Sequence, residues 1–166
     1  MAPQRRRAGA ALRAPGRLPA GGLQPLHDLQ QLREFFAGIE TLPLSSEAEF
    51  TADPRMVAAG ESFLRRSLEG LLDLGRPVLS KGFGKVVPDY AAVADELAAQ
   101  GLLPAESAAK LRLMARYRNR MTHFYDDVTP GELYGILASR REDVEEILAT
   151  IQSWLAAHPE VCDEEL

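Results

Sequence analysis

Cysteine is almost absent from this chain of 166 residues. A single Cys162 can form neither an intrachain disulfide nor a cysteine-based metal site, which is typical of proteins from a reducing cytosol. The chain also lacks a hydrophobic run long enough to span a membrane. Histidine is scarce, because only His27, His123 and His158 are present, and no Glu-x-x-His pair accompanies them. We therefore expect a cytoplasmic protein without a metal or a cofactor, with His158 exposed at a helix end.

The beginning of the chain differs in composition from the rest. Residues 1–22 contain five arginines and no acidic residue, and they are rich in alanine, glycine and proline. The apolar segment of a secretory signal is missing. We predict a disordered arm over residues 1–25, with extra residues from an early start codon as another interpretation. An RNA-binding arm is a further alternative.

The remaining chain is acidic. The net charge is -5, and without the five arginines of the arm it is about -10. A generally basic nucleic-acid surface is therefore excluded, and any contact with RNA must be local. We expect one helical domain over residues 26–160, followed by an acidic tail over residues 161–166.

Apolar residues recur at helical spacing along most of this domain, and no strand pattern is visible. Helices are predicted over residues 26–39, 54–78, 88–101, 105–124 and 130–157, joined by a polar connector over residues 45–52 and by loops. Asp53 before Pro54 is a favourable helix start, and Thr129-Pro130-Gly131-Glu132 reads as a capping box. The predicted fold class is all-α, an up-and-down bundle of four to five helices.

Residues 81–85 have the sequence Lys-Gly-Phe-Gly-Lys, which superficially suggests a phosphate-binding loop. The hydroxyl residue that such a loop requires after its lysine is replaced by Val86, and no strand precedes the segment. We therefore interpret it as a flexible loop between helices.

The densest group of chemically useful side chains lies in residues 116–125, near the end of a predicted helix. On a helical wheel Arg116, Asn119 and His123 form a stripe opposite the apolar face, whereas Arg118 and Tyr125 lie on a flank about 140° away from His123. Arg118 and His123 therefore cannot converge on one regular helix, unless the helix ends nearby or a second copy contributes. Periodicity alone favours a solvated basic stripe.

The literal spacing Arg118-x4-His123-x-Tyr125, with Asn119 directly after the arginine, resembles the signature of HepT-like toxins of the HEPN superfamily. The resemblance extends over about residues 50–155. It includes a long predicted helix in which Glu61, Leu64, Glu69 and Asp73 have the spacing seen in the family. A Pro-Asp-Tyr segment at residues 88–90 and a Leu-x-x-x-Gly-Leu-Leu-Pro segment at residues 97–104 follow it.

This resemblance implies a metal-independent endoribonuclease that acts as a homodimer. Arg118 and His123 would be catalytic, since an arginine fork can hold a phosphate and a histidine can move protons near neutral pH. Asn119, Arg116 and Arg120 would support catalysis and bind RNA.

The resemblance also implies control by a partner. HepT-like toxins are paired with an MNT-type nucleotidyltransferase antitoxin, which would transfer AMP to Tyr125 and so silence the enzyme, as in a type VII-like toxin–antitoxin system. The alternative is a non-catalytic HEPN protein that binds nucleotide and forms a complex with such a nucleotidyltransferase. Without the resemblance, Tyr125 is interpreted as a flank tyrosine packed on the bundle edge.

Overall fold

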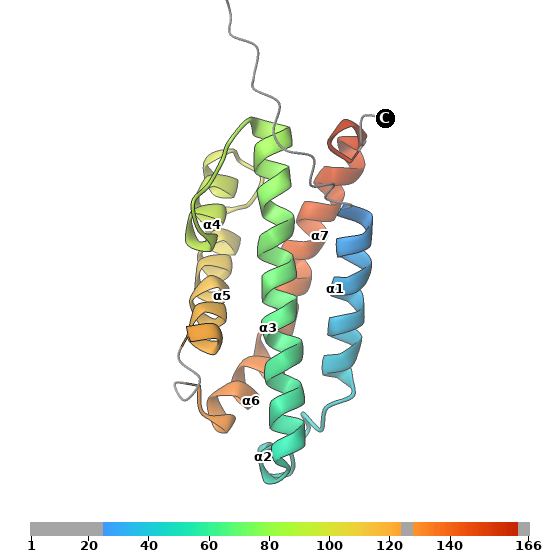
Figure 1. Ribbon diagram of the computed structural model, residues 1–166, viewed down its shortest axis with the longest axis vertical. Coiled ribbons are helices and arrows are strands. Elements are labelled where there is room, and N and C mark those ends of the chain that lie inside the picture. The colour runs from blue at the N-terminus through green and yellow to red at the C-terminus, as the bar shows by residue number, and fades with distance from the viewer. Residues whose placement is uncertain (1–24, 124–127, 163–166) are drawn as a thin grey trace, which may run out of the picture.

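The computed structural model describes residues 25–123 and 128–162. Four long helices, α1, α3, α5 and α7, run side by side, and α4 packs beside α5 (Figure 1). The short helices α2 and α6 lie together at one end of the bundle. The described residues contain helices and no strand, which confirms the predicted all-α class.

The elements follow one another with short connections. In chain order they are α1 (Pro25–Glu40), α2 (Glu47–Ala52), α3 (Pro54–Pro77), the π-helix η1 (Val78–Gly82), α4 (Tyr90–Ala99), α5 (Ala105–His123), α6 (Pro130–Ser139), α7 (Arg141–Ala157) and the 3₁₀-helix η2 (Pro159–Val161). The predicted tail over residues 161–166 and the predicted arm over residues 1–25 lie almost entirely outside the described residues.

Side-chain caps start several of these helices. Asp53 accepts a hydrogen bond from the Arg55 amide at 2.9 Å, and Pro54 occupies the first turn of α3, as predicted. Thr129 caps α6 by accepting from the Glu132 amide at 3.2 Å. The expected capping box is only half formed, because the Glu132 side chain turns to another helix instead.

Helix α3 is the centre of the core and contacts α1, α4, α5 and α6. Its leucines Leu68, Leu71, Leu72 and Leu74 are at most 1% exposed. Full burial of each such side chain stabilises the fold by about 1.5–3 kcal/mol. Gly75 allows α4 to approach closely, since a Cβ at this position would lie 2.5 Å from Val93 Cγ1.

Two predictions about the element boundaries are wrong. The polar connector over residues 45–52 contains helix α2, because Phe50 is fully buried there and packs against the ring of Tyr134 at 6.0 Å. The last predicted helix is broken into α6 and α7 at Arg140. The break is held by ion pairs of Arg140 with Asp143 at 3.2 Å and of Arg141 with Glu40.

The segment predicted as a flexible loop also differs. It begins inside η1, which follows Pro77, and Gly84 then takes a positive φ of 65° that suits glycine. Phe83 stacks on Trp154 with ring centroids 5.3 Å apart, and Trp154 stacks on His158 at 4.1 Å. His158 is therefore half-buried rather than exposed, and its Nδ1 lies 2.8 Å from the carbonyl oxygen of Trp154.

Among the described residues, no helix combines the length and the hydropathy that a membrane-spanning segment needs.

Candidate functional site

Helix α5 positions most of the predicted site residues. Its inner face buries small and apolar side chains, which are Ser107, Ala108, Leu111, Met114, Ala115 and Met121. Because this face is fixed against the core, the polar residues between 116 and 123 are directed to the surface or to the neighbouring helices. Tyr125 lies outside the described residues.

His123 is the last residue of α5, and its side chain is exposed. Within the described parts of the chain, no hydrogen bond or ion pair engages its imidazole. The ring is thus open to solvent at the end of the helix. An exposed imidazole in this position can exchange protons with a bound molecule.

Arg118 is held on several sides by its neighbours. Its Nε donates to Glu69 Oε1 on α3 at 3.2 Å, and its second terminal nitrogen lies 3.2 Å from the same oxygen. Its first terminal nitrogen donates to Asn119 Oδ1 at 3.3 Å. The guanidinium carbon also lies 4.8 Å from the centroid of the Tyr90 ring. With 19% of its side chain exposed, Arg118 is a fixed cation with a narrow opening to solvent.

Tyr90, the first residue of α4, connects this arginine to α3. Its hydroxyl donates to Asp73 Oδ1 at 2.7 Å. Partial burial raises the pKa of Tyr90 to about 12, and the hydrogen bond to the Asp73 carboxylate adds to this effect, while Arg118 and Arg76 oppose it. Tyr90 is therefore neutral at physiological pH and donates its proton to Asp73.

The other predicted residues of the cluster have different surroundings. Arg120 binds both carboxylate oxygens of Glu132 at 2.6 Å and 3.0 Å, which ties α5 to α6, and it lies 5.7 Å from the Tyr117 ring centroid. Arg116 and Asn119 are exposed. In the described part of the chain, Arg116 has no carboxylate partner.

Arg118 and His123 do not meet within one copy of the chain. Arg118 contacts α3 and α4, whereas His123 faces solvent at the helix end, and no hydrogen bond joins the two in the described residues. This agrees with the helical wheel, which places them far apart around α5. A site that uses both residues on one phosphate needs a further contribution.

The structure adds residues whose roles the sequence does not reveal. Glu69 and Asp73 have family-like spacing in the sequence, and they now have partners in Arg118 and Tyr90. Their separation of four residues places them on one face of α3, which was the available signal. Arg76 is a new member of the group, because its guanidinium carbon lies 4.7 Å from the Tyr90 ring centroid.

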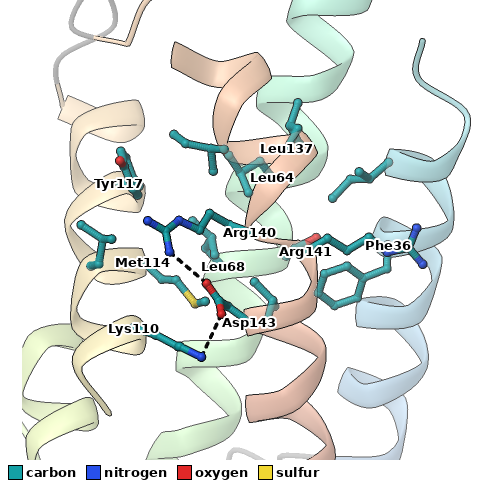
Figure 2. A pocket seen from close by; sticks show the side chains of 15 residues that line it. Phe36, Leu64, Leu68, Lys110, Met114, Tyr117, Leu137, Arg140, Arg141 and Asp143 are labelled. Atoms are coloured by element: carbon teal, nitrogen blue, oxygen red, sulfur yellow. Dashed lines mark hydrogen bonds and ion pairs between the residues drawn. The ribbon is translucent and has the colours of Figure 1, made fainter. Parts of the chain in front are cut away.

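Two hollows lie beside the residues around Arg118 and Tyr117. An open groove of about 660 Å³ runs between α1 and α3, and its lining residues include Phe35, Arg65, Glu69, Asp73 and Arg76. The second hollow is a mainly apolar cavity of about 30 Å³ near Tyr117. Figure 2 shows Asp143 between Lys110 and Arg140 at this cavity, with contacts of 3.0 Å and 3.2 Å. This volume holds only one or two water molecules and is too small for a nucleotide.

Metal ligands do not gather anywhere in the described residues, since no group of three or more His, Cys, Asp or Glu side chains is placed to hold an ion. The polar groups that the structure does bring together near α5 are arginines, carboxylates and a tyrosine. Such a group can bind a phosphate through its guanidinium nitrogens.

One of the comparisons with known proteins shows a family. A family model described as "Ribonuclease HepT-like" matches residues 26–151. Comparison with curated proteins gives no match.

Solved structures share the fold at low sequence identity. A tri-AMPylated HEPN toxin from Shewanella oneidensis, in complex with an MNT antitoxin, is 16% identical with a TM-score of 0.71, covering 78% of this chain and 96% of that one. A mutant of the toxin–antitoxin MntA-HpeT is 16% identical with a TM-score of 0.69, covering 78% and 97%. The cytosolic protein of unknown function YutE from Bacillus subtilis is 18% identical with a TM-score of 0.68, covering 85% and 93%.

Proposed function

This chain belongs to the HepT-like ribonuclease family, and from that premise we propose that it is the toxin of a HepT–MNT toxin–antitoxin pair, a metal-independent endoribonuclease. The observation that carries the proposal is that one helix presents both a fixed arginine and an exposed histidine. Arg118 is anchored by Glu69, and His123 is open to solvent at the end of α5.

The chemistry needs no metal, because RNA supplies its own nucleophile. The 2′-oxygen attacks the neighbouring phosphorus, a new P–O2′ bond forms, and the bond from phosphorus to the 5′-oxygen of the next nucleotide breaks. One proton leaves the 2′-hydroxyl and one proton reaches the departing 5′-oxygen. The products are a 2′,3′-cyclic phosphate and a free 5′-hydroxyl.

Each of these steps has a candidate group. His123 transfers protons, since one nitrogen of an exposed imidazole can accept a proton while the other donates one. Arg118 holds the phosphate oxygens and stabilises the negative charge that grows on them during the attack. Asn119 and Arg116 are exposed on the same stretch of α5 and are proposed to contact the RNA backbone. Arg120 is proposed as a supporting residue through its bond to Glu132.

A homodimer solves the geometric problem that a single copy poses. Arg118 and His123 point in different directions on α5, so one copy cannot place both on one phosphate. A two-fold axis near the end of α5 would bring Arg118 of one protomer towards the partner's His123. We therefore propose that the cleavage site is a cleft between two copies.

The proposal is tested by incubating the purified protein with RNA in the presence of EDTA. Cleavage should persist and leave 2′,3′-cyclic phosphate ends. His123→Ala and Arg118→Ala should each lower the rate by about 10²-fold or more while the melting temperature stays close to that of the wild type. His158→Ala is the matched histidine control, because His158 follows α7, and the last turns of α7 and of α5 lie toward opposite ends of the bundle (Figure 1).

The result also separates the two candidate functions. If the wild-type protein cleaves no RNA but binds an MNT-type nucleotidyltransferase, the protein is a non-catalytic helper. If His123→Ala cleaves as fast as the wild type, the ribonuclease assignment of this site is wrong.

A further inference from the structure

Two arginines share the ring of Tyr90. The guanidinium carbons of Arg118 and Arg76 lie 4.8 Å and 4.7 Å from its centroid. Because both distances end at the same point, the two carbons are separated by no more than about 9.5 Å, the sum of the two. Attraction between each cation and the ring orients both side chains.

The ring itself is fixed in place. The Tyr90 hydroxyl is bound to Asp73, which projects from the same helix as Arg76. The α4 helix that begins at Tyr90 is held close to α3, because Gly75 leaves room for Val93. Tyr90 is thus an ordered platform, and the two guanidinium groups keep a defined spacing.

Arg76 differs from Arg118 in how its charge is balanced. Arg118 has Glu69 as a close carboxylate partner, whereas Arg76 has none among the residues that the structure describes. The Arg76 side chain is exposed, and its nitrogens remain available to a ligand. Since Arg76 is a cation without a carboxylate partner among the described residues, the ligand that it suits is an anion.

A longer anionic ligand bound at Arg76 would extend into the groove between α1 and α3. Arg76 lines this groove of about 660 Å³ together with Arg65, Arg66 and the ring of Phe35. The groove also contains the carboxylates of Asp28, Glu69 and Asp73, of which Glu69 is bound to Arg118 and Asp73 to the Tyr90 hydroxyl. The negative charge of Glu69 is partly offset by its ion pairs with Arg118 and Arg65.

We propose that Arg76 is a second phosphate-binding site, which holds a phosphate of single-stranded RNA close to the one held by Arg118. The guanidinium fork is suited to phosphate oxygens, and two such forks near each other select two phosphates of one strand. The strand then continues along the groove between α1 and α3. This inference rests on the proposed ribonuclease function, and it assigns a substrate subsite to a residue outside the motif.

The experiment compares a dinucleotide, which has only the scissile phosphate, with a short single-stranded oligonucleotide that has several phosphates. Arg76→Gln should raise KM for the oligonucleotide about tenfold and leave kcat unchanged, because one charge-assisted contact is lost. Cleavage of the dinucleotide should not change. Arg55→Gln is the matched control, since Arg55 is an exposed arginine near the other end of α3, about 30 Å away along the helix.

Binding provides a readout that does not depend on cleavage. With an oligonucleotide carrying 2′-O-methyl groups, which cannot be cleaved, the salt dependence of the wild-type affinity should be steeper than that of Arg76→Gln. The expected difference in slope is about 0.7, the value for one phosphate of a single strand. Arg76→Lys should recover the slope, because it restores the charge, but only part of the affinity, because it lacks the guanidinium fork.

The possible failures are distinguishable. If the wild type binds the modified oligonucleotide but cleaves no RNA, the proposed function fails. The salt dependence of binding still tests the role of Arg76 in that case. If Arg76→Gln matches Arg55→Gln in KM and in slope, the second phosphate site is wrong even where cleavage persists. If Arg76→Gln slows the dinucleotide and the oligonucleotide equally, Arg76 acts through Tyr90 on Arg118, and the proposed subsite is also wrong.

Discussion

Glu69 Oε1 accepts a hydrogen bond from Arg118 Nε at 3.2 Å, across 49 positions of sequence. This contact joins the central helix α3 to the helix that contains the motif. Arg65 shares the same carboxylate at 3.4 Å. Glu69 therefore sets the direction of the Arg118 guanidinium before any substrate is present.

Removal of the Glu69 carboxylate should reduce RNA cleavage. Glu69→Ala frees Arg118 to adopt other rotamers, and misplacing a phosphate-binding group lowers the rate by about 10- to 100-fold. Glu69→Gln should retain more activity, because its amide oxygen can still accept the hydrogen bond. Steady-state kinetics on RNA measures kcat and KM for both variants. Faster cleavage by Glu69→Ala would show instead that Glu69 competes with the phosphate for Arg118.

Light scattering at micromolar concentration should show a dimer of about twice 18.2 kDa. The expectation rests on the exposed polar face of α5, which includes Asn119 and His123. Mixing inactive Arg118→Ala and His123→Ala proteins should then restore part of the activity, because a mixed dimer contains one intact composite site. A clean monomer, or a mixture that stays inactive, would contradict the composite cleft.

A cognate MNT-type nucleotidyltransferase, supplied with ATP and Mg²⁺, should add mass to this chain in whole AMP units. The expected acceptor is Tyr125, and the added negative charge should repel RNA from the nearby arginines. Mass spectrometry of the intact protein and of its peptides locates the modification. Tyr125→Phe should fold normally, take up no AMP and remain toxic. AMP on another residue would contradict this assignment.

The pKa of Tyr90 predicts a loss of stability at high pH. Since the folded-state pKa is raised from 10.0 to about 12, the native state keeps its proton where the unfolded chain has lost it. This contribution is fully present below pH 10 and disappears as the pH rises towards 12. Urea unfolding across this range should show a steeper decline for wild type than for Tyr90→Phe. Equal slopes would show that Tyr90 titrates normally.

Two glycine substitutions should have opposite effects on the free energy of unfolding. Gly75→Ala places a Cβ 2.5 Å from Val93 Cγ1 in the core, and such overpacking costs about 1–3 kcal/mol. Gly135→Ala, in the exposed surface of α6, meets nothing within 4 Å and should stabilise that helix by up to about 1 kcal/mol. Denaturant unfolding measures both. A stable Gly75→Ala protein would mean that α4 can shift away from α3.

The sequence alone predicts the all-α class and several helix starts, because these depend on local patterns. Asp53-Pro54 and Thr129 begin their helices as expected, since a cap satisfies amides only two or three residues away. The wheel also separates Arg118 from His123, because both lie on one regular helix. The resemblance of residues 118–125 to the family motif is visible for the same reason, since its spacing is local.

The tertiary structure decided what surrounds the motif. The sequence shows the spacing of Glu69 and Asp73 but not their partners, and packing of α3 against α5 and α4 gives Arg118 to Glu69 and Tyr90 to Asp73. Phe50 lies in a stretch that reads as a polar connector, but a niche between α3 and α6 buries it. Such contacts depend on which helix faces meet and on the relative shift of the two helices along their axes. Helical periodicity specifies neither. The sequence therefore determined which side chains belong to the motif, and only the packing of the helices determined which of them is held and which is open to solvent.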